Sequence, residues 1–254
     1  MTPFCFIFGF CIYTILTMSA RTELDLYNPR PKWMRYLLTY GALFLGTVLA
    51  KTTVKGRHNI PKKGPYIVAA NHFSLVDGPF LVYALQRPIT FLVASDQVIS
   101  WYFKWATWLY GFIPVNRVKM SPSTIKKAKA VLQSNNILGI MPEGTSAGRQ
   151  LRAAKKGIVY LSTLENTHIL PIGIYGLKHI WPNWFRGIRP KVKVQVGKPF
   201  LPYECIKSSV DREKKMTIIG ENIICRIAAL LPNEAHGIYK GDKRIEQYAK
   251  KNEL

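Results

Sequence analysis

The segment PYIVAANHFSLVDGPFLVYALQ, residues 65–86, sets the expected fold. Its first part, 65–70, is a short apolar run that predicts a buried strand. Its last part, 77–86, begins with Asp-Gly-Pro and continues with apolar residues, which predicts a helix. The polar residues between them lie where a strand gives way to a helix, and this is a common position for a functional site in α/β folds.

The rest of the body repeats this order of strand and helix. Further strands are expected at 90–95, 111–116, 137–141, 168–174 and 191–197, and further helices at 97–109, 122–134, 151–164 and 213–231. The alternation of Lys and Val in 191–197 predicts a half-exposed strand at an edge of the sheet. Alternation of strands and helices favours a layered α/β domain.

The N-terminal fifth has a different composition. Residues 2–20 are an uncharged run of about 28 Å as a helix, and residues 36–50 form a second run of about 22 Å. The first has the length of a membrane span, and the second suits a buried, re-entrant or interfacial helix. A cleaved signal peptide is disfavoured because no Lys or Arg precedes the first run. We expect membrane-anchoring helices over 1–54, one main domain over 55–235 and a polar tail over 236–254.

The net charge of +22 is distributed unevenly. Residues 21–200 contain 26 basic and 6 acidic side chains, whereas residues 201–254 contain 10 and 8. Residues 51–63, which follow the second apolar run, contain five Lys or Arg and no acid. A basic cluster next to an apolar helix attracts anionic lipid and marks the cytoplasmic side of a membrane. The charge therefore favours an anionic membrane as a partner over nucleic acid, for which no motif is present.

The polar loop after the first strand carries a possible catalytic pair. A separation of five residues lets Asp77 fold back onto His72 and hold one ring nitrogen, so that the other nitrogen can accept a proton. This is the base and its orienting acid, without a protein nucleophile. An alternative is that Asp77 caps the helix that starts with Gly-Pro and that His72 is an ordinary loop histidine.

Two more sites follow expected strands. Arg117 ends the stretch Gly-Phe-Ile-Pro-Val-Asn-Arg, and an Arg at a strand end can bind phosphate with two hydrogen bonds, or form a surface ion pair. Glu143, Gly144 and Thr145 follow the strand at 137–141, where an acid beside backbone N–H groups could bind hydroxyls or simply form a turn.

Taken together, these sites resemble one protein family. Asn-His-x4-Asp at 71–77, the stretch at 111–117 and Pro-Glu-Gly-Thr at 142–145 are similar to the first three sequence blocks of the glycerolipid acyltransferases, the 1-acylglycerol-3-phosphate (lysophosphatidic acid) acyltransferases and their relatives. Ile-Leu-Pro-Ile-Gly at 169–173 resembles a fourth block, and Gly-Lys-Pro at 197–199 resembles a late turn. The resemblance covers about residues 55–200, and the two apolar N-terminal runs resemble a membrane-embedding element of bacterial members.

The resemblance implies a mixed sheet flanked by helices. It also implies a reaction mechanism. His72 would act as general base on the free hydroxyl of lysophosphatidic acid, and Asp77 would orient His72. The oxygen would attack the thioester of acyl-CoA or acyl-acyl-carrier protein, giving phosphatidic acid in one step, with no metal and no bound cofactor. Arg117 would bind the acceptor phosphate, and residues 143–145 would position its glycerol.

One position departs from the family pattern. The family continues Glu-Gly-Thr with Arg, whereas this chain has Ser146. Arg149, Arg152, Lys155 or Lys156 could supply the missing cation, and Lys156 best matches a further family position. The change leaves the acceptor headgroup open, so an acyltransferase for another lysophospholipid or lipid acceptor remains an alternative.

Two other classes of protein fit parts of the sequence. Residues 144–148 read Gly-Thr-Ser-Ala-Gly, the nucleophile pattern of serine hydrolases, with Asp211 and His236 later in the chain. A hydrolase is disfavoured because Pro142 and Glu143 separate this pattern from the strand. The hydrolase interpretation also leaves His72, Asp77 and Arg117 unexplained. A non-enzymatic basic binder of membranes or nucleic acid is disfavoured because no nucleic-acid motif is present. The expected location is the inner, cytoplasmic membrane, with the catalytic domain on the cytoplasmic face, and acyl-chain length, donor and oligomeric state stay open.

Overall fold

The structure is a computed structural model that describes residues 30–94, 110–116, 120–144, 148–205 and 211–252. Seven strands in these ranges form one mixed sheet in the order β1-β7-β6-β2-β5-β3-β4. The strands are β1 (Lys51–Lys55), β2 (Tyr66–Ala70), β3 (Ile89–Ala94), β4 (Phe112–Val115), β5 (Ile137–Ile140), β6 (Ile169–Tyr175) and β7 (Lys191–Val196). The helices are α2 (Lys32–Leu49), α3 (Asp77–Leu85), α5 (Pro122–Gln133), α6 (Lys156–Ser162), α7 (Ile180–Phe185), α8 (Arg212–Ala228) and α9 (Lys243–Asn252).

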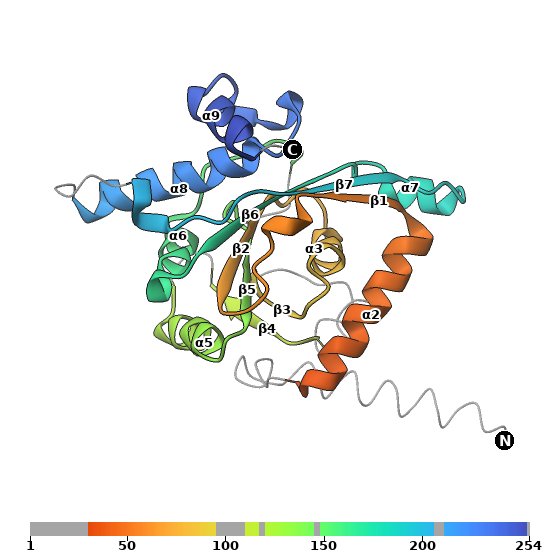
Figure 1. Cartoon of the computed structure of the whole chain (residues 1–254), viewed down its shortest axis with the longest axis horizontal. Helices are drawn as coiled ribbons and strands as arrows, with labels where there is room; N and C mark the ends of the chain where they lie inside the picture. Colours follow the sequence, from red (N-terminus) through yellow and green to blue (C-terminus); the bar gives the residue numbers. More distant parts are fainter. Residues whose placement is uncertain (1–29, 95–109, 117–119, 145–147, 206–210, 253–254) are drawn as a thin grey trace.

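Helices lie on both sides of the sheet (Figure 1), and an apolar core lies on each face. Alternate residues of β2 explain this division, because successive side chains of a strand point to opposite faces. Ile67 and Ala69 face the core built with α5, α6 and α8, whereas Tyr66, Val68 and Ala70 face the core built with α3. β2 is buried throughout, as expected for a central strand covered by helices on both sides.

The expected mixed sheet flanked by helices is confirmed, with one strand added. β1 pairs in parallel with β7 from Lys51↔Lys191 to Lys55↔Gln195. The outer edge is therefore β1, and the prediction that 191–197 forms an edge strand is wrong. The expected domain boundary between residues 54 and 55 falls inside β1.

Helix α6 is shorter than the predicted helix over 151–164. It begins at Lys156 because the preceding segment is held extended by partners elsewhere in the chain. The N–H of Leu151 donates to the carbonyl of Ala235 at 2.8 Å, and the N–H of Lys155 donates to the carbonyl of Pro142 at 2.8 Å. Backbone groups bonded to distant segments cannot form the first turn of a helix.

α2 packs against α3 where the ring of Tyr83 lies over Gly46. A Cβ on Gly46 would lie 2.7 Å from this ring, so a larger residue here would force the ring to move. The C-terminal end of α2 is capped from the other side, since the indole of Trp184 donates to the carbonyl of Leu49 at 2.8 Å and Arg189 donates to the carbonyl of Ala50 at 3.0 Å. Among the described helices, none is long and apolar enough to span a membrane. The predicted helix over 2–20 lies outside the described residues.

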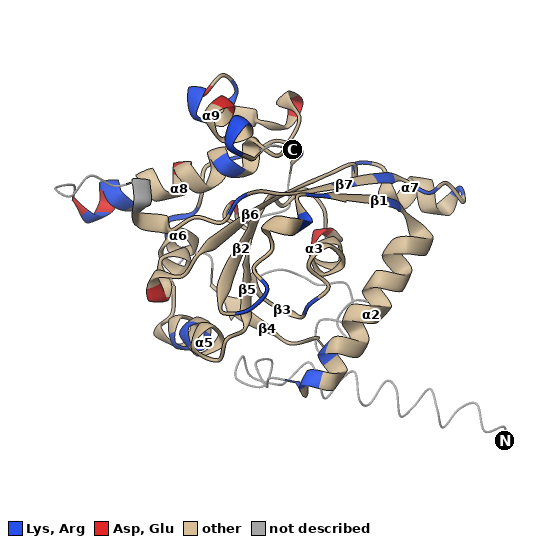
Figure 2. Cartoon of the chain, viewed as in Figure 1, with Lys and Arg blue, Asp and Glu red and all other residues tan. Residues whose placement is uncertain are grey.

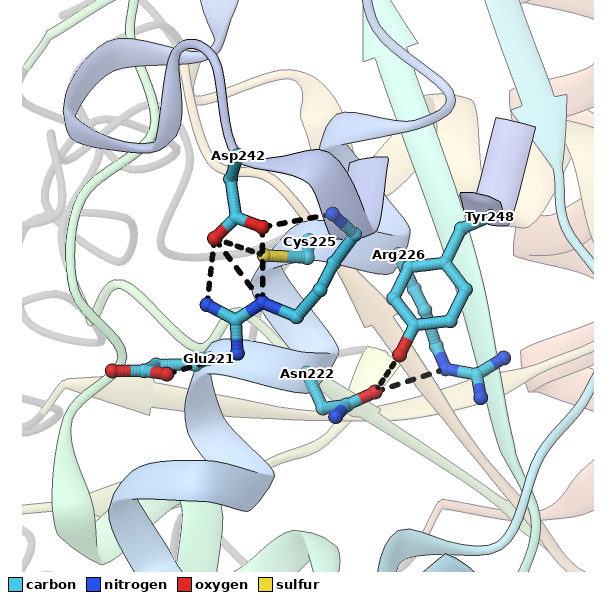
Figure 3. A network of polar contacts seen from close by, with 7 residues as sticks. Glu221, Asn222, Cys225, Arg226, Asp242 and Tyr248 are labelled. Atoms are coloured by element: carbon cyan, nitrogen blue, oxygen red, sulfur yellow. Dashed lines mark hydrogen bonds and ion pairs between the residues drawn. The ribbon is translucent and has the colours of Figure 1, made fainter. Parts of the chain in front are cut away.

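The segment over 236–254, expected as a polar tail, contains the helix α9, which a polar network fixes to α8 (Figure 3). Arg244 bonds both oxygens of Asp242 and reaches Glu221 on α8 at 2.9 Å. The guanidinium of Arg226 lies 4.0 Å from the centre of the Phe200 ring and 4.3 Å from that of Tyr248. These contacts join the C-terminal segment to the main domain.

Candidate active site

The loop between β2 and α3 brings His72 and Asp77 into contact. Nδ1 of His72 lies 2.9 Å from Oδ2 of Asp77. The same oxygen accepts the backbone N–H groups of Phe73 and Ser74, each at 2.8 Å. The His72 side chain is 17% exposed and that of Asp77 is 1% exposed. The carboxylate is thus fixed inside the fold, while the imidazole reaches the surface.

The structure decides between the two interpretations of Asp77. Asp77 is the first residue of α3, and the residue before it, Val76, provides no side-chain cap. The carboxylate turns away from the helix and bonds N–H groups that precede it in the chain. Asp77 therefore holds the loop and contacts His72, and it does not act as the helix cap of the alternative interpretation.

Burial raises the pKa of Asp77, and the contact with His72 and the two N–H groups offsets part of this rise. The buried Oδ1 has no hydrogen-bond partner among the described residues. A carboxylate on Nδ1 keeps the proton on that nitrogen, so that Nε2 is free to accept a proton from a bound hydroxyl. The pair therefore has the geometry of a general base with its orienting acid.

Asn71 braces this loop from the neighbouring strand. Its side-chain nitrogen donates to the carbonyl of Ile174 at 2.9 Å, and its oxygen accepts the N–H of the same residue at 2.8 Å. Asn71 is fully buried, so it replaces a ladder pair at the point where β2 ends and β6 continues. The sequence alone indicates no separate role for Asn71, because its partner Ile174 lies 103 residues away.

Glu143 joins His72 from the next strand of the sheet. β2 and β5 are parallel neighbours, so the residues after their carboxyl ends meet at one edge. Oε1 of Glu143 accepts the backbone N–H of His72 at 3.1 Å. Glu143 is 1% exposed, and burial raises its pKa from 4.5 to about 7, partly offset by this N–H group and by Arg152. Glu143 thus holds the backbone of the base.

Gly144 lets the chain turn directly after Glu143. Its φ is +71°, a left-handed conformation that favours glycine, and a Cβ there would lie 3.0 Å from Cγ of Lys155. Its N–H donates to the carbonyl of Met141 at 3.0 Å. Arg117 and Thr145, the other expected acceptor-binding residues, lie outside the described residues, as does Ser146.

The cations near the site are arranged differently from the sequence expectation. Lys156 forms an ion pair with Glu213 at the start of α8, and both side chains are largely exposed. Arg152 instead approaches Glu143, with 3.8 Å between Nε and Oε2. Of the four cations that could replace the family Arg, Arg152 is the one placed beside the buried acid.

Other reactive groups serve the fold or lie apart. His236, a possible partner of Ser146, is buried with Nε2 3.1 Å from the carbonyl of Leu231. No group of three or more His, Cys, Asp or Glu that could bind a metal occurs in the part of the chain that the structure describes.

The part of the chain that contains the candidate site is similar to known proteins. Residues 51–175 match the family model described as Acyltransferase. A 1-acyl-sn-glycerol-3-phosphate acyltransferase of Borreliella burgdorferi is 29% identical over 134 residues, which cover 52% of this chain and 54% of that protein. A protein of the same name from Bacillus subtilis is 25% identical over 148 residues, covering 58% and 72%. The chain spans about half the length of the first of these relatives.

A solved structure shares the fold. The crystal structure of the 1-acyl-sn-glycerophosphate (LPA) acyltransferase from Thermotoga maritima superimposes with a TM-score of 0.53 at 20% identity and covers 86% of each chain. The residues that match the family model run from β1 to β6 and include His72, Asp77 and Glu143. On this sequence match, residues 51–175 form a domain of the acyltransferase family, similar to the 1-acyl-sn-glycerol-3-phosphate acyltransferases named above.

Proposed function

We propose that the protein is an O-acyltransferase that moves a fatty acyl chain from a thioester donor to the free hydroxyl of lysophosphatidic acid. The product is phosphatidic acid, and the role is in phospholipid biosynthesis. The observation that carries the proposal is the 2.9 Å contact between His72 Nδ1 and Asp77 Oδ2 on a loop within the acyltransferase domain. The relatives named above are 1-acyl-sn-glycerol-3-phosphate acyltransferases, which supports this acceptor.

In the proposed reaction, Nε2 of His72 takes the proton of the acceptor hydroxyl as its oxygen attacks the thioester carbonyl. The new carbon–oxygen ester bond forms, the carbon–sulfur bond breaks, and the proton passes from His72 to the departing thiolate. Asp77 stabilises the imidazolium that forms in between. The step needs no metal and no bound cofactor.

Glu143 acts on the base through the backbone of His72, so its primary role is positioning. Gly144 and Thr145 place the acceptor glycerol, and Arg117 binds its phosphate. Since Lys156 is engaged by Glu213, we assign the cation that replaces the missing family Arg to Arg152. A guanidinium here favours an acceptor with an anionic headgroup.

α2 carries the proposed membrane contact. Trp33, Leu37, Tyr40, Phe44 and Val48 recur at helical spacing, and each is between 48% and 69% exposed. A contiguous apolar stripe of this kind suits the interface between headgroups and acyl chains. We propose that α2 lies in the surface of the cytoplasmic membrane and holds the catalytic domain on its cytoplasmic face, where the lipid acceptor is found.

Acyl transfer by the purified protein tests the reaction. A panel of lysophospholipids with different headgroups is offered with acyl-CoA and with acyl-acyl-carrier protein, and the diacyl product is measured by mass spectrometry. We expect phosphatidic acid from lysophosphatidic acid, and no product above background from His72→Ala. Transfer at the wild-type rate by a folded His72→Ala variant would overturn the mechanism. Preference for a lysophospholipid with a neutral headgroup would overturn the assignment of lysophosphatidic acid as the acceptor.

A further inference from the structure

Two strands at the edge of the sheet present a face of four lysines. Lys51 and Lys55 on β1 and Lys191 and Lys193 on β7 are all exposed. Val192, Val194 and Val196 of β7 point into the core on the side of α3, so the lysines project from the opposite face. Basic residues recur along both strands in Figure 2. These residues, called the four-lysine face below, cover roughly 5 by 13 Å at the level of the backbone.

The lysines of this face have no acidic partners within the described parts of the chain. None of the four forms an ion pair there, and the register places Lys51 directly opposite Lys191. Like charges opposite one another in a sheet are destabilising. Lysines on an edge strand prevent unwanted pairing, but β7 is paired on both sides, so that role does not account for Lys191 and Lys193. The cluster therefore indicates an anionic partner.

The four-lysine face extends to the active-site edge of the sheet. Lys193 pairs with Tyr175, the residue after Ile174, and Ile174 is bonded by Asn71 next to the catalytic His72. β7 lies two strands from β2, which corresponds to roughly 10 Å. A flexible prosthetic arm can bridge such a separation, so a donor bound here could deliver a thioester to the site.

The shape and position of the four-lysine face indicate which kind of partner binds there. Thr53, Lys55, Lys193 and Gln195 line a small hollow, with no aromatic ring to stack on a nucleotide base. α2 packs on the other side of the sheet, through Ala42 against the core that contains the β7 valines. The side chains of the four-lysine face therefore project away from the core against which α2 packs. Spread lysine charges on an open sheet surface suit the acidic surface of a folded protein.

We propose that the four-lysine face docks an acidic acyl-carrier protein, which presents the acyl thioester to His72. This inference rests on the proposed function, because it names the donor for that reaction. Docking places four cations against carboxylates of the carrier, while the thioester on its prosthetic arm reaches around the carboxyl edge of the sheet. The interaction weakens with salt, as expected for exposed charges.

The test compares a four-lysine variant with a matched control. In the first, Lys51, Lys55, Lys191 and Lys193 are changed to Gln. In the control, the same number of exposed lysines is changed to Gln elsewhere: Lys126, Lys214, Lys240 and Lys243. Both variants are checked for an unchanged melting temperature, and KM and kcat are measured with acyl-acyl-carrier protein and with acyl-CoA. Binding of the carrier protein without an acyl group is measured separately by calorimetry, and binding to anionic vesicles by sedimentation.

We expect the four-lysine variant to raise KM for the carrier-protein donor at least about tenfold and to weaken carrier binding by a similar factor. Its kcat and its KM for acyl-CoA stay unchanged, and the control behaves as wild type. An unchanged KM for the carrier donor, an equal loss with both donors, or a loss confined to anionic-vesicle binding would each overturn the proposal.

Carrier binding separates this inference from the proposed function. If wild type transfers acyl chains from neither donor, the acyltransferase proposal fails. In that case carrier binding that is lost only in the four-lysine variant still supports the docking surface, and absence of carrier binding overturns it.

Discussion

Replacing Asp77 by Asn changes one carboxylate oxygen into an amide nitrogen and removes the charge beside His72. The remaining amide oxygen can still accept the N–H groups of Phe73 and Ser74, which are bonded at 2.8 Å in the wild type. The same oxygen also contacts Nδ1 of His72, so the amide nitrogen takes the place of Oδ1, which has no partner among the described residues. The imidazole therefore keeps its proton on Nδ1 but loses the negative charge that stabilises the imidazolium formed during proton transfer.

Asp77→Asn should reduce the catalytic rate far more than it reduces folding stability. Loss of the charge that stabilises the imidazolium should lower kcat about 10²- to 10⁴-fold, or roughly 3–5.5 kcal/mol of barrier. Folding stability should change by only about 1 kcal/mol, because burial already disfavours the charged form of Asp77, as its raised pKa indicates. Asp77→Ala differs, since it leaves the N–H groups of Phe73 and Ser74 without an acceptor at about 1–3 kcal/mol each.

The measurement combines urea unfolding with acyl-transfer kinetics on wild type, Asp77→Asn and Asp77→Ala. Circular dichroism follows unfolding, and initial rates are taken at saturating donor and acceptor. An Asn variant that keeps a rate within tenfold of wild type would refute the role of the Asp77 charge in stabilising the imidazolium. An Ala variant as stable as the Asn variant would refute its role in holding the loop.

Four further changes follow from the geometry. Burial raises the pKa of Glu143 from 4.5 to about 7, so the unfolding free energy of the wild type should fall as pH rises through this range. In urea titrations, Glu143→Gln should make this fall between pH 5 and pH 8 smaller by roughly 2–3 kcal/mol. The same pH dependence of stability in both proteins would contradict this. Arg117→Ala should raise the acceptor KM about tenfold or more with little change in kcat, and an unchanged KM would remove the phosphate assignment. Changing Leu37 and Phe44, 62% and 69% exposed, to Ser should weaken sedimentation with anionic vesicles while leaving the melting temperature within a few degrees, and undiminished binding would argue against α2 as the contact. Arg244→Met should lower the unfolding free energy by about 1 kcal/mol and speed hydrogen exchange in α9, whereas unaltered exchange would show that the network in Figure 3 does not fix that helix.

The sequence was sufficient where the deciding interactions are local. The run at 65–70, followed by Asn-His-x4-Asp, predicted a buried strand, a loop and a helix, and these appear as β2 and α3. Five residues are close enough for Asp77 to reach His72 with little freedom in the intervening chain. The strands at 137–141 and 168–174 were likewise predicted from their short apolar runs, and differ from β5 and β6 only at their ends.

The sequence was insufficient where a residue's partner lies far along the chain. Lys51–Lys55 reads as a basic cluster beside an apolar helix, and only its pairing with β7 makes it a strand. The expected helix over 151–164 is shortened because residues 151 and 155 bond distant carbonyls. In both cases local composition was consistent with more than one structure, and a tertiary contact selected one.

For the candidate active site, sequence by itself indicated His72, Asp77 and the block that contains Glu143. Tertiary structure decided what these groups touch. It brought Glu143 onto the backbone of His72 across 71 residues, placed Arg152 beside that acid and engaged Lys156 with Glu213. The physical reason is the parallel pairing of β2 and β5, which gathers the ends of strands that are separate in the chain. A motif specifies which groups are present, whereas the order of strands in the sheet specifies which of them meet.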